Sequence, residues 1–86
     1  MARIEVYTTQ SCPYCVRAKR LLQERGLAYE EFDVGDDAAL RARIVERSGG
    51  RRTVPQIFID DRPIGGYEEL AALDASGELA ALTRDH

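Results

Sequence analysis

Two patterns of apolar residues divide the chain into short strands and amphipathic helices. Runs rich in β-branched and aromatic residues predict four strands, over residues 4–8, 27–34, 56–59 and 62–65. Apolar residues spaced at the helical period predict three helices with one buried stripe each, over about 13–25, 36–47 and 66–75. A final short helix carries Leu79 and Leu82.

Several polar residues, prolines and glycines mark where these elements begin and end. Ser11 is in position to cap the first helix, and Pro13 suits its first turn, where a missing N–H is harmless. Gly26 stands where a left-handed residue ends a helix. Asp36 or Asp37 can cap the second helix, and Pro63 favours a strand at the edge of a sheet.

The order of elements is β-α-β-α-β-β-α. A strand, helix and strand at the start predict a parallel pair with a right-handed crossover, and the tight Asp60-Asp61 turn predicts an antiparallel pair. The apolar 56–59 strand belongs in the middle of the sheet. The expected class is α/β, with a four-stranded mixed sheet flanked by helices in one domain spanning residues 1–86.

Composition excludes several classes of function. The net charge of −3 and the interleaving of Arg with acids argue against a nucleic-acid partner. No apolar run approaches the roughly 20 residues that cross a bilayer, and the start lacks the features of a secretory signal. We therefore expect a cytoplasmic protein without a membrane partner. In that reducing compartment a pair of cysteines is typically redox-active or metal-binding.

The two cysteines lie in Cys12-Pro13-Tyr14-Cys15, at the predicted start of the first helix. Unpaired N–H groups and the dipole at a helix start favour the thiolate form of Cys12, which precedes the helix. Cys15 falls on the apolar stripe one turn later, so we expect it to be more buried. Cys12 is thus predicted to attack, and Cys15 to resolve the mixed disulfide that forms.

A metal site is the alternative use for these thiols. Structural zinc requires four Cys or His ligands, and the chain offers two cysteines and His86. One chain therefore cannot complete such a site, and we expect no metal, although a cluster shared between two subunits stays open.

Two further segments suggest a ligand site. Thr53-Val54-Pro55 is either a simple turn into a strand or a cis-proline that exposes the Val54 backbone to an extended peptide. Gly65-Gly66-Tyr67-Glu68-Glu69 is either a plain strand-to-helix turn or a binding site for an α-amino acid head group. In the second case helix N–H groups take the carboxylate and a Glu takes the ammonium.

Together, these three motifs, in this order and spacing, resemble those of a dithiol glutaredoxin of the small bacterial type, over Ile4 to about Leu82. The resemblance implies a thioredoxin-like fold, a monomer, and glutathione as cosubstrate rather than a tightly bound cofactor. It implies reduction of protein disulfides and glutathione mixed disulfides through a redox-active Cys12–Cys15 pair. The implied glutathione contacts are Tyr14, Thr53, Val54, cis Pro55, Gly66, Tyr67, Glu68 and Glu69.

The chain departs from that family's pattern at two positions. Thr9 stands where the family usually has a Lys that helps to hold the glycyl carboxylate of glutathione, and our hypothesis is that Arg51 or Arg52 supplies that charge. Tyr67 replaces a small residue or Cys. Two other functions remain open: a thiol reductase of the same fold fed by a thioredoxin reductase, and a dimeric iron–sulfur carrier, which Pro13 disfavours.

Overall fold

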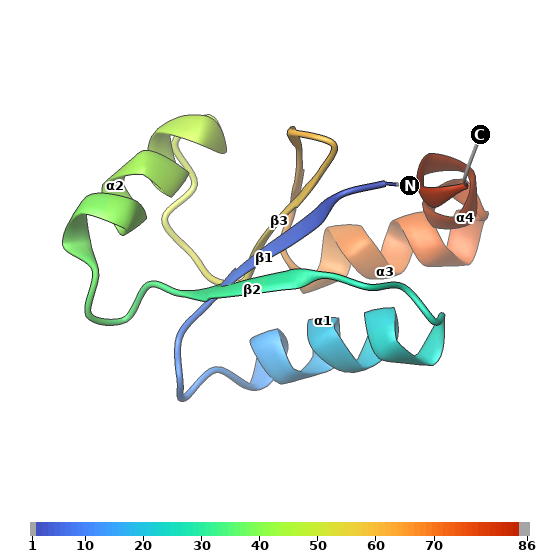
Figure 1. Ribbon diagram of the computed structural model, residues 1–86, viewed down its shortest axis with the longest axis horizontal. Coiled ribbons are helices and arrows are strands. Elements are labelled where there is room, and N and C mark those ends of the chain that lie inside the picture. Colours follow the sequence, from blue (N-terminus) through green and yellow to red (C-terminus); the bar gives the residue numbers. More distant parts are fainter. Residues whose placement is uncertain (1, 85–86) are drawn as a thin grey trace.

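The computed structural model describes residues 2–84, so His86 lies outside the described residues. The elements follow the expected order (Figure 1). The strands are β1 (Ile4–Thr8), β2 (Glu30–Asp33), β3 (Gln56–Ile59) and β4 (Arg62–Gly65). The helices are α1 (Pro13–Glu24), α2 (Ala38–Arg47), α3 (Tyr67–Ser76) and α4 (Glu78–Thr83).

The strands form a mixed sheet in the order β2-β1-β3-β4. β1 pairs in parallel with β2 and antiparallel with β3, so Val6 lies between Glu31 and Ile57. β3 pairs antiparallel with β4, and Pro63 lies on that edge strand. The predicted α/β class, the mixed sheet and the central position of β3 are therefore confirmed.

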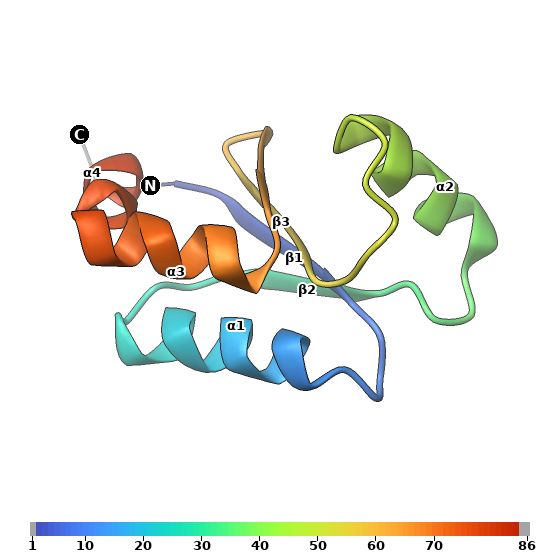
Figure 2. The same cartoon turned by 180° about the vertical axis from the view of Figure 1, so that it is seen from behind.

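Helices cover both faces of the sheet, but unequally. Figures 1 and 2 show α1 and α3 together on one side, while α2 stands apart from them on the other side. The first face holds the larger core: Ile4, Val6, Ala18, Leu22, Ile57, Ile59, Leu70 and Leu79. The second face holds a smaller core: Tyr7, Val34, Ile44 and Phe58. Alternating positions of β1 and β3 supply the two faces.

The second strand is shorter than the sequence predicts. It begins at Glu30 rather than residue 27, because residues 27–29 form an irregular connection after the end of α1 at Glu24. Gly26 takes the left-handed conformation, with φ at 69°, and the Leu27 N–H donates to the Leu22 carbonyl. Leu27 and Tyr29 nevertheless pack against the larger core, which explains their apolar pattern.

Within residues 2–84, none of the helices has the length and apolar character to cross a membrane.

Candidate active site

Cys12 itself caps α1, so the prediction that Ser11 is the cap was wrong. Cys12 is extended, and its Sγ accepts a hydrogen bond of 3.1 Å from the Cys15 N–H. Pro13 follows in the first turn, as predicted. A thiol can replace the usual hydroxyl cap because sulfur accepts weakly when neutral and strongly when ionised. The structure thus directs a helix N–H at the sulfur of Cys12.

The two thiols have different surroundings. Cys12 is partly exposed, whereas Cys15 is 1% exposed and belongs to the buried side of α1. Burial, followed by the hydrogen bond to Cys12 and its charge, raises the pKa of Cys15 to about 12. Cys15 is therefore a neutral thiol in the reduced protein, and Cys12 is the sulfur that a substrate can reach.

A loop ahead of β3 faces Cys12. The Val54–Pro55 peptide bond is cis, and the Val54 carbonyl lies 3.6 Å from Cys12 Sγ. The Gln56 side chain donates to the Thr53 carbonyl at 2.8 Å, which ties the loop to the buried start of β3. The cis interpretation of Thr53-Val54-Pro55 is therefore confirmed, and the segment stands opposite the thiol.

A cavity of about 320 Å³ extends beside this loop. Nine residues line it: Tyr14, Arg51, Thr53, Val54, Pro55, Gly66, Tyr67, Glu68 and Glu69. They come from the start of α1, the 51–55 segment and the start of α3, so the fold brings together segments far apart in sequence. Of the predicted glutathione contacts, Arg52 alone is not among the lining residues.

Glu69 holds one wall of the cavity together. Its Oε1 accepts from the Gly66 N–H at 2.6 Å and from Arg51 Nη2 at 3.0 Å. The Gly66 hydrogen bond, against the opposing effect of desolvation and with help from Arg51, lowers the pKa of Glu69. Gly65 allows this packing, because a Cβ there would lie 2.5 Å from Arg51 Nη1. Sequence reasoning missed this ion pair, since its partners stand 18 positions apart with no shared motif.

Two tyrosines form the other wall. The rings of Tyr14 and Tyr67 are tilted, with centroids 6.4 Å apart. Tyr14 is 51% exposed, and the Arg17 guanidinium lies over it at 5.3 Å from the ring centroid. An exposed aromatic surface beside a reactive thiol can pack against the apolar part of a bound peptide.

Among residues 2–84, no group of three or more Cys, His, Asp or Glu side chains is placed to hold a metal ion. The site therefore consists of an accessible thiol, a buried thiol, an exposed backbone segment and a helix start with two acids.

An α/β fold with a capped Cys-x-x-Cys facing a cis-proline is characteristic of thioredoxin-like thiol–disulfide oxidoreductases. A glutaredoxin family model matches residues 4–64. Glutaredoxin 3 of Escherichia coli strain K12 is 50% identical over 84 residues, which cover 98% of this chain and all of that protein. The chain belongs to the glutaredoxin family.

Solved structures agree with that assignment. The solution structure of a Brucella melitensis glutaredoxin has a TM-score of 0.84 at 45% identity, covering 95% of this chain and 88% of that one. The crystal structure of a buckwheat glutaredoxin–glutathione complex also has a TM-score of 0.84, at 28% identity, covering 92% and 74%. The family resemblance and the thioredoxin-like fold are thus confirmed, and the family's chemistry is thiol–disulfide exchange.

Proposed function

We propose that the protein reduces glutathione mixed disulfides and protein disulfides, with glutathione as the electron donor. The observation that carries this proposal is the placement of Cys12 Sγ 3.6 Å from the Val54 carbonyl, at the end of the cavity wall. A thiol there can attack a disulfide whose peptide part lies along the exposed Val54 backbone. The buckwheat glutaredoxin–glutathione complex supports the choice of ligand.

The first step joins Cys12 to glutathione. The Cys12 thiolate attacks the glutathione sulfur of the mixed disulfide, the substrate sulfur leaves as a thiolate, and a proton from solvent neutralises it. The Cys15 N–H, 3.1 Å from Cys12 Sγ, stabilises the anion before attack and again when Cys12 leaves. A second glutathione thiolate then attacks the glutathione sulfur, which releases glutathione disulfide and regenerates Cys12.

Reduction of a protein disulfide uses Cys15 as well. Cys12 attacks first, and Cys15 then displaces the substrate sulfur to close the Cys12–Cys15 disulfide, which two glutathione molecules reduce back to the dithiol with release of glutathione disulfide. Two of the causes that raise the pKa of Cys15 are its hydrogen bond with Cys12 and the Cys12 charge. Both disappear once Cys12 is in a mixed disulfide, so Cys15 becomes easier to ionise when its attack is needed.

The cavity offers a partner for each end of glutathione. We assign the cysteinyl backbone to Val54, beside Thr53 and Pro55, and the γ-glutamyl carboxylate to the N–H groups where α3 begins at Tyr67. Glu68 takes the ammonium, because Glu69 already accepts from Gly66 and Arg51.

Arg51 lies on the cavity wall and takes the glycyl carboxylate in place of the lysine that Thr9 replaces. Arg52, outside the lining, is the weaker candidate for this role. Tyr14 and Tyr67 form the aromatic wall of the proposed glutathione site. In this proposal the protein acts as a monomer in the cytoplasm, where glutathione is kept reduced.

The test is glutathione-coupled reduction of a small glutathione mixed disulfide and of a protein disulfide. We expect Cys12→Ser to abolish both activities, and Cys15→Ser to keep the first and lose the second. Activity supported by thioredoxin reductase but not by glutathione would replace this proposal with the rival reductase. Retention of either activity in Cys12→Ser would overturn the assigned roles.

A further inference from the structure

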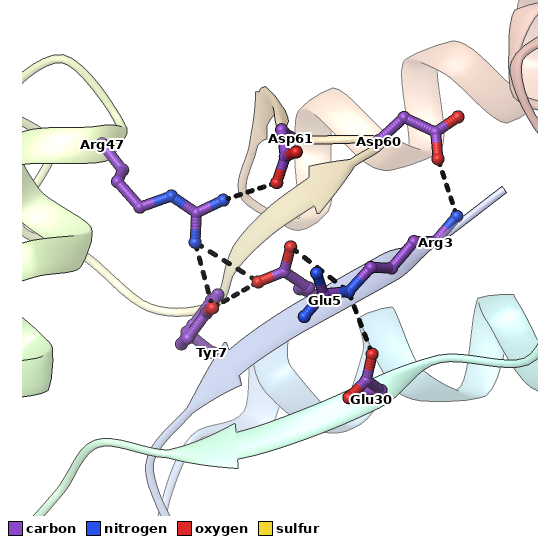
Figure 3. A network of polar contacts seen from close by, with 7 residues as sticks. All are labelled: Arg3, Glu5, Tyr7, Glu30, Arg47, Asp60 and Asp61. Atoms are coloured by element: carbon purple, nitrogen blue, oxygen red, sulfur yellow. Dashed lines mark hydrogen bonds and ion pairs between the residues drawn. The ribbon is translucent and has the colours of Figure 1, made fainter.

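A buried ion-pair cluster lies on the α2 face of the sheet, away from Cys12. Glu5, in the middle of β1, is 3% exposed although it is acidic. Its Oε1 accepts from the Tyr7 hydroxyl at 2.5 Å and from Arg47 Nη1 at 3.3 Å (Figure 3). Arg47 Nη1 also donates to the Tyr7 hydroxyl at 3.1 Å, and Nη2 reaches Asp61 at 3.4 Å. The proposed catalytic steps use none of these groups.

Arg47 is the polar attachment of α2 to the sheet. Within residues 2–84, it is the residue of α2 whose side chain hydrogen-bonds to the strands and their turn, and its guanidinium lies 4.2 Å from the Phe58 ring centroid. The apolar attachment consists of buried Ile44 and partly buried Leu40. Since Arg47 is the last residue of α2, the cluster fixes the end of the helix from which the 48–54 segment departs.

That segment is hydrogen-bonded back to the helix end. The Gly50 N–H donates to the Val45 carbonyl at 2.8 Å. Ser48 Oγ accepts from the Arg51 N–H at 3.2 Å and donates to the Val45 carbonyl at 3.0 Å. The Arg51 backbone is thus held by the end of α2, whereas Thr53 is held by Gln56 at the start of β3. A displacement of the helix end therefore moves Arg51 first.

We infer that Arg47 is a positioning residue for substrate binding, acting through Arg51. The buried Glu5–Arg47 pair sets the end of α2, that end sets the Arg51 backbone, and Arg51 then reaches the cavity wall beside Glu69. Cys12 lies outside this sequence of contacts. The inference rests on the proposed function, because the quantity that Arg47 governs is the binding of the glutathionyl group.

The test measures the KM for a small glutathione mixed disulfide, at saturating glutathione, in Arg47→Met. We expect this KM to rise roughly threefold to tenfold, as for groups coupled through direct contacts, with kcat unchanged within about twofold. Arg43→Met is the matched control, because Arg43 lies one turn earlier on α2. Its side chain is exposed and forms no ion pair with any residue in 2–84. The control should keep the wild-type KM.

The route through Arg51 is tested by a double-mutant cycle. In an Arg51→Ala background, Arg47→Met should raise the KM no further, because the contact it acts through is gone. An equal rise in both backgrounds would show a general loosening and overturn the inference, as would an unchanged KM in Arg47→Met or in Arg51→Ala alone.

Glu5→Gln/Arg47→Met guards against a variant that fails to fold, because it removes the buried charge together with its partner. It should show the same rise in KM; a wild-type KM in the folded double variant would also contradict the inference. Absence of glutathione-dependent turnover in the wild-type protein would instead refute the proposed function.

Discussion

The two faces of the sheet are stabilised by different means. The face under α1 and α3 is closed by eight buried apolar residues, and it supports the helix that carries Cys12 and Cys15. The face under α2 has four buried hydrophobic residues, one of which is Tyr7, and the Tyr7 phenol is in contact with the Glu5 carboxylate and the Arg47 guanidinium. Apolar contacts can form in many relative orientations of the packed elements, whereas the hydrogen bonds of a planar guanidinium fix one orientation.

This difference suggests a division of labour. The apolar face supplies most of the stability, since stabilisation follows the apolar area removed from water. The polar face adds little net stability, because the desolvation of its charges offsets their attraction. Its value lies in fixing the end of α2, and with it the cavity wall. Variants on the two faces should therefore separate stability from substrate binding.

Leu22→Ala should have the largest effect. Leu22 is fully buried at the centre of the larger core, so its truncation leaves a cavity and lowers the free energy of unfolding by about 4 kcal/mol. Urea denaturation measures this value. Leu21→Ala, on the same helix but only partly buried, is the control and should cost clearly less. Equal losses at both positions would contradict the packing described for this face.

Arg47→Met should come next, at about 2 kcal/mol, because it removes the guanidinium that donates to buried Glu5 and leaves only the more distant Arg3, whose Nε lies 3.9 Å from Glu5 Oε2. Glu5→Gln/Arg47→Met should recover most of that loss, to within about 1 kcal/mol of the wild type. The same urea titration compares the three proteins. If the double variant is as unstable as Arg47→Met, the polar face contributes stability as well as geometry.

Acidic pH should reduce the contribution of the same cluster to the stability of the fold. Burial by itself would raise the pKa of Glu5, but the hydrogen bonds from Tyr7 and Arg47 and the charges of Arg47 and Arg3 together lower it below the ordinary 4.5. A carboxyl group whose pKa is lowered on folding stabilises the fold at pH values above its unfolded-state pKa. That stabilisation is lost as the pH falls through its folded-state pKa.

The wild type should therefore lose stability relative to Glu5→Gln/Arg47→Met as pH falls below 4.5. The free energy of unfolding measured against pH tests this. Glu69 and Asp74, whose pKa values are also lowered, are common to both proteins and cancel in the difference. A difference that is flat with pH would exclude an ionised Glu5 in the folded protein.

Asp37→Ala should have the smallest effect, about 1 kcal/mol, because it removes the side-chain cap that accepts from the Leu40 N–H at 3.0 Å. Asp36→Ala is the control and should change the unfolding free energy by less, since Asp37 is the residue that caps α2. A larger loss for Asp36→Ala would contradict this cap.

Local patterns were enough to predict much of the fold and part of the site. The helical stripe through Cys15, a cap at either Asp36 or Asp37 and the edge position of Pro63 follow from spacing and from the chemistry of single residues. The cis Val54–Pro55 bond was one of two open interpretations until the resemblance favoured it, because periodicity carries no information on peptide isomers.

What the sequence could not reveal depends on contacts between distant residues. Glu5 looks like an ordinary polar position of a strand, and its burial follows from Arg47, which is 42 residues away. The Arg51–Glu69 pair likewise forms only when the fold brings the 51–55 segment to the start of α3. The second strand was predicted too long, because Leu27 and Tyr29 are apolar through core packing rather than strand pairing.

The most direct test of the account measures how fast each cysteine of the reduced, folded protein reacts with iodoacetamide near pH 7, with the label located by fragment mass spectra. The account predicts rapid modification of Cys12 and protection of Cys15, which is 1% exposed and has a pKa of about 12. Modification of Cys15 as fast as Cys12, or of neither thiol, would contradict the roles assigned to the two sulfurs.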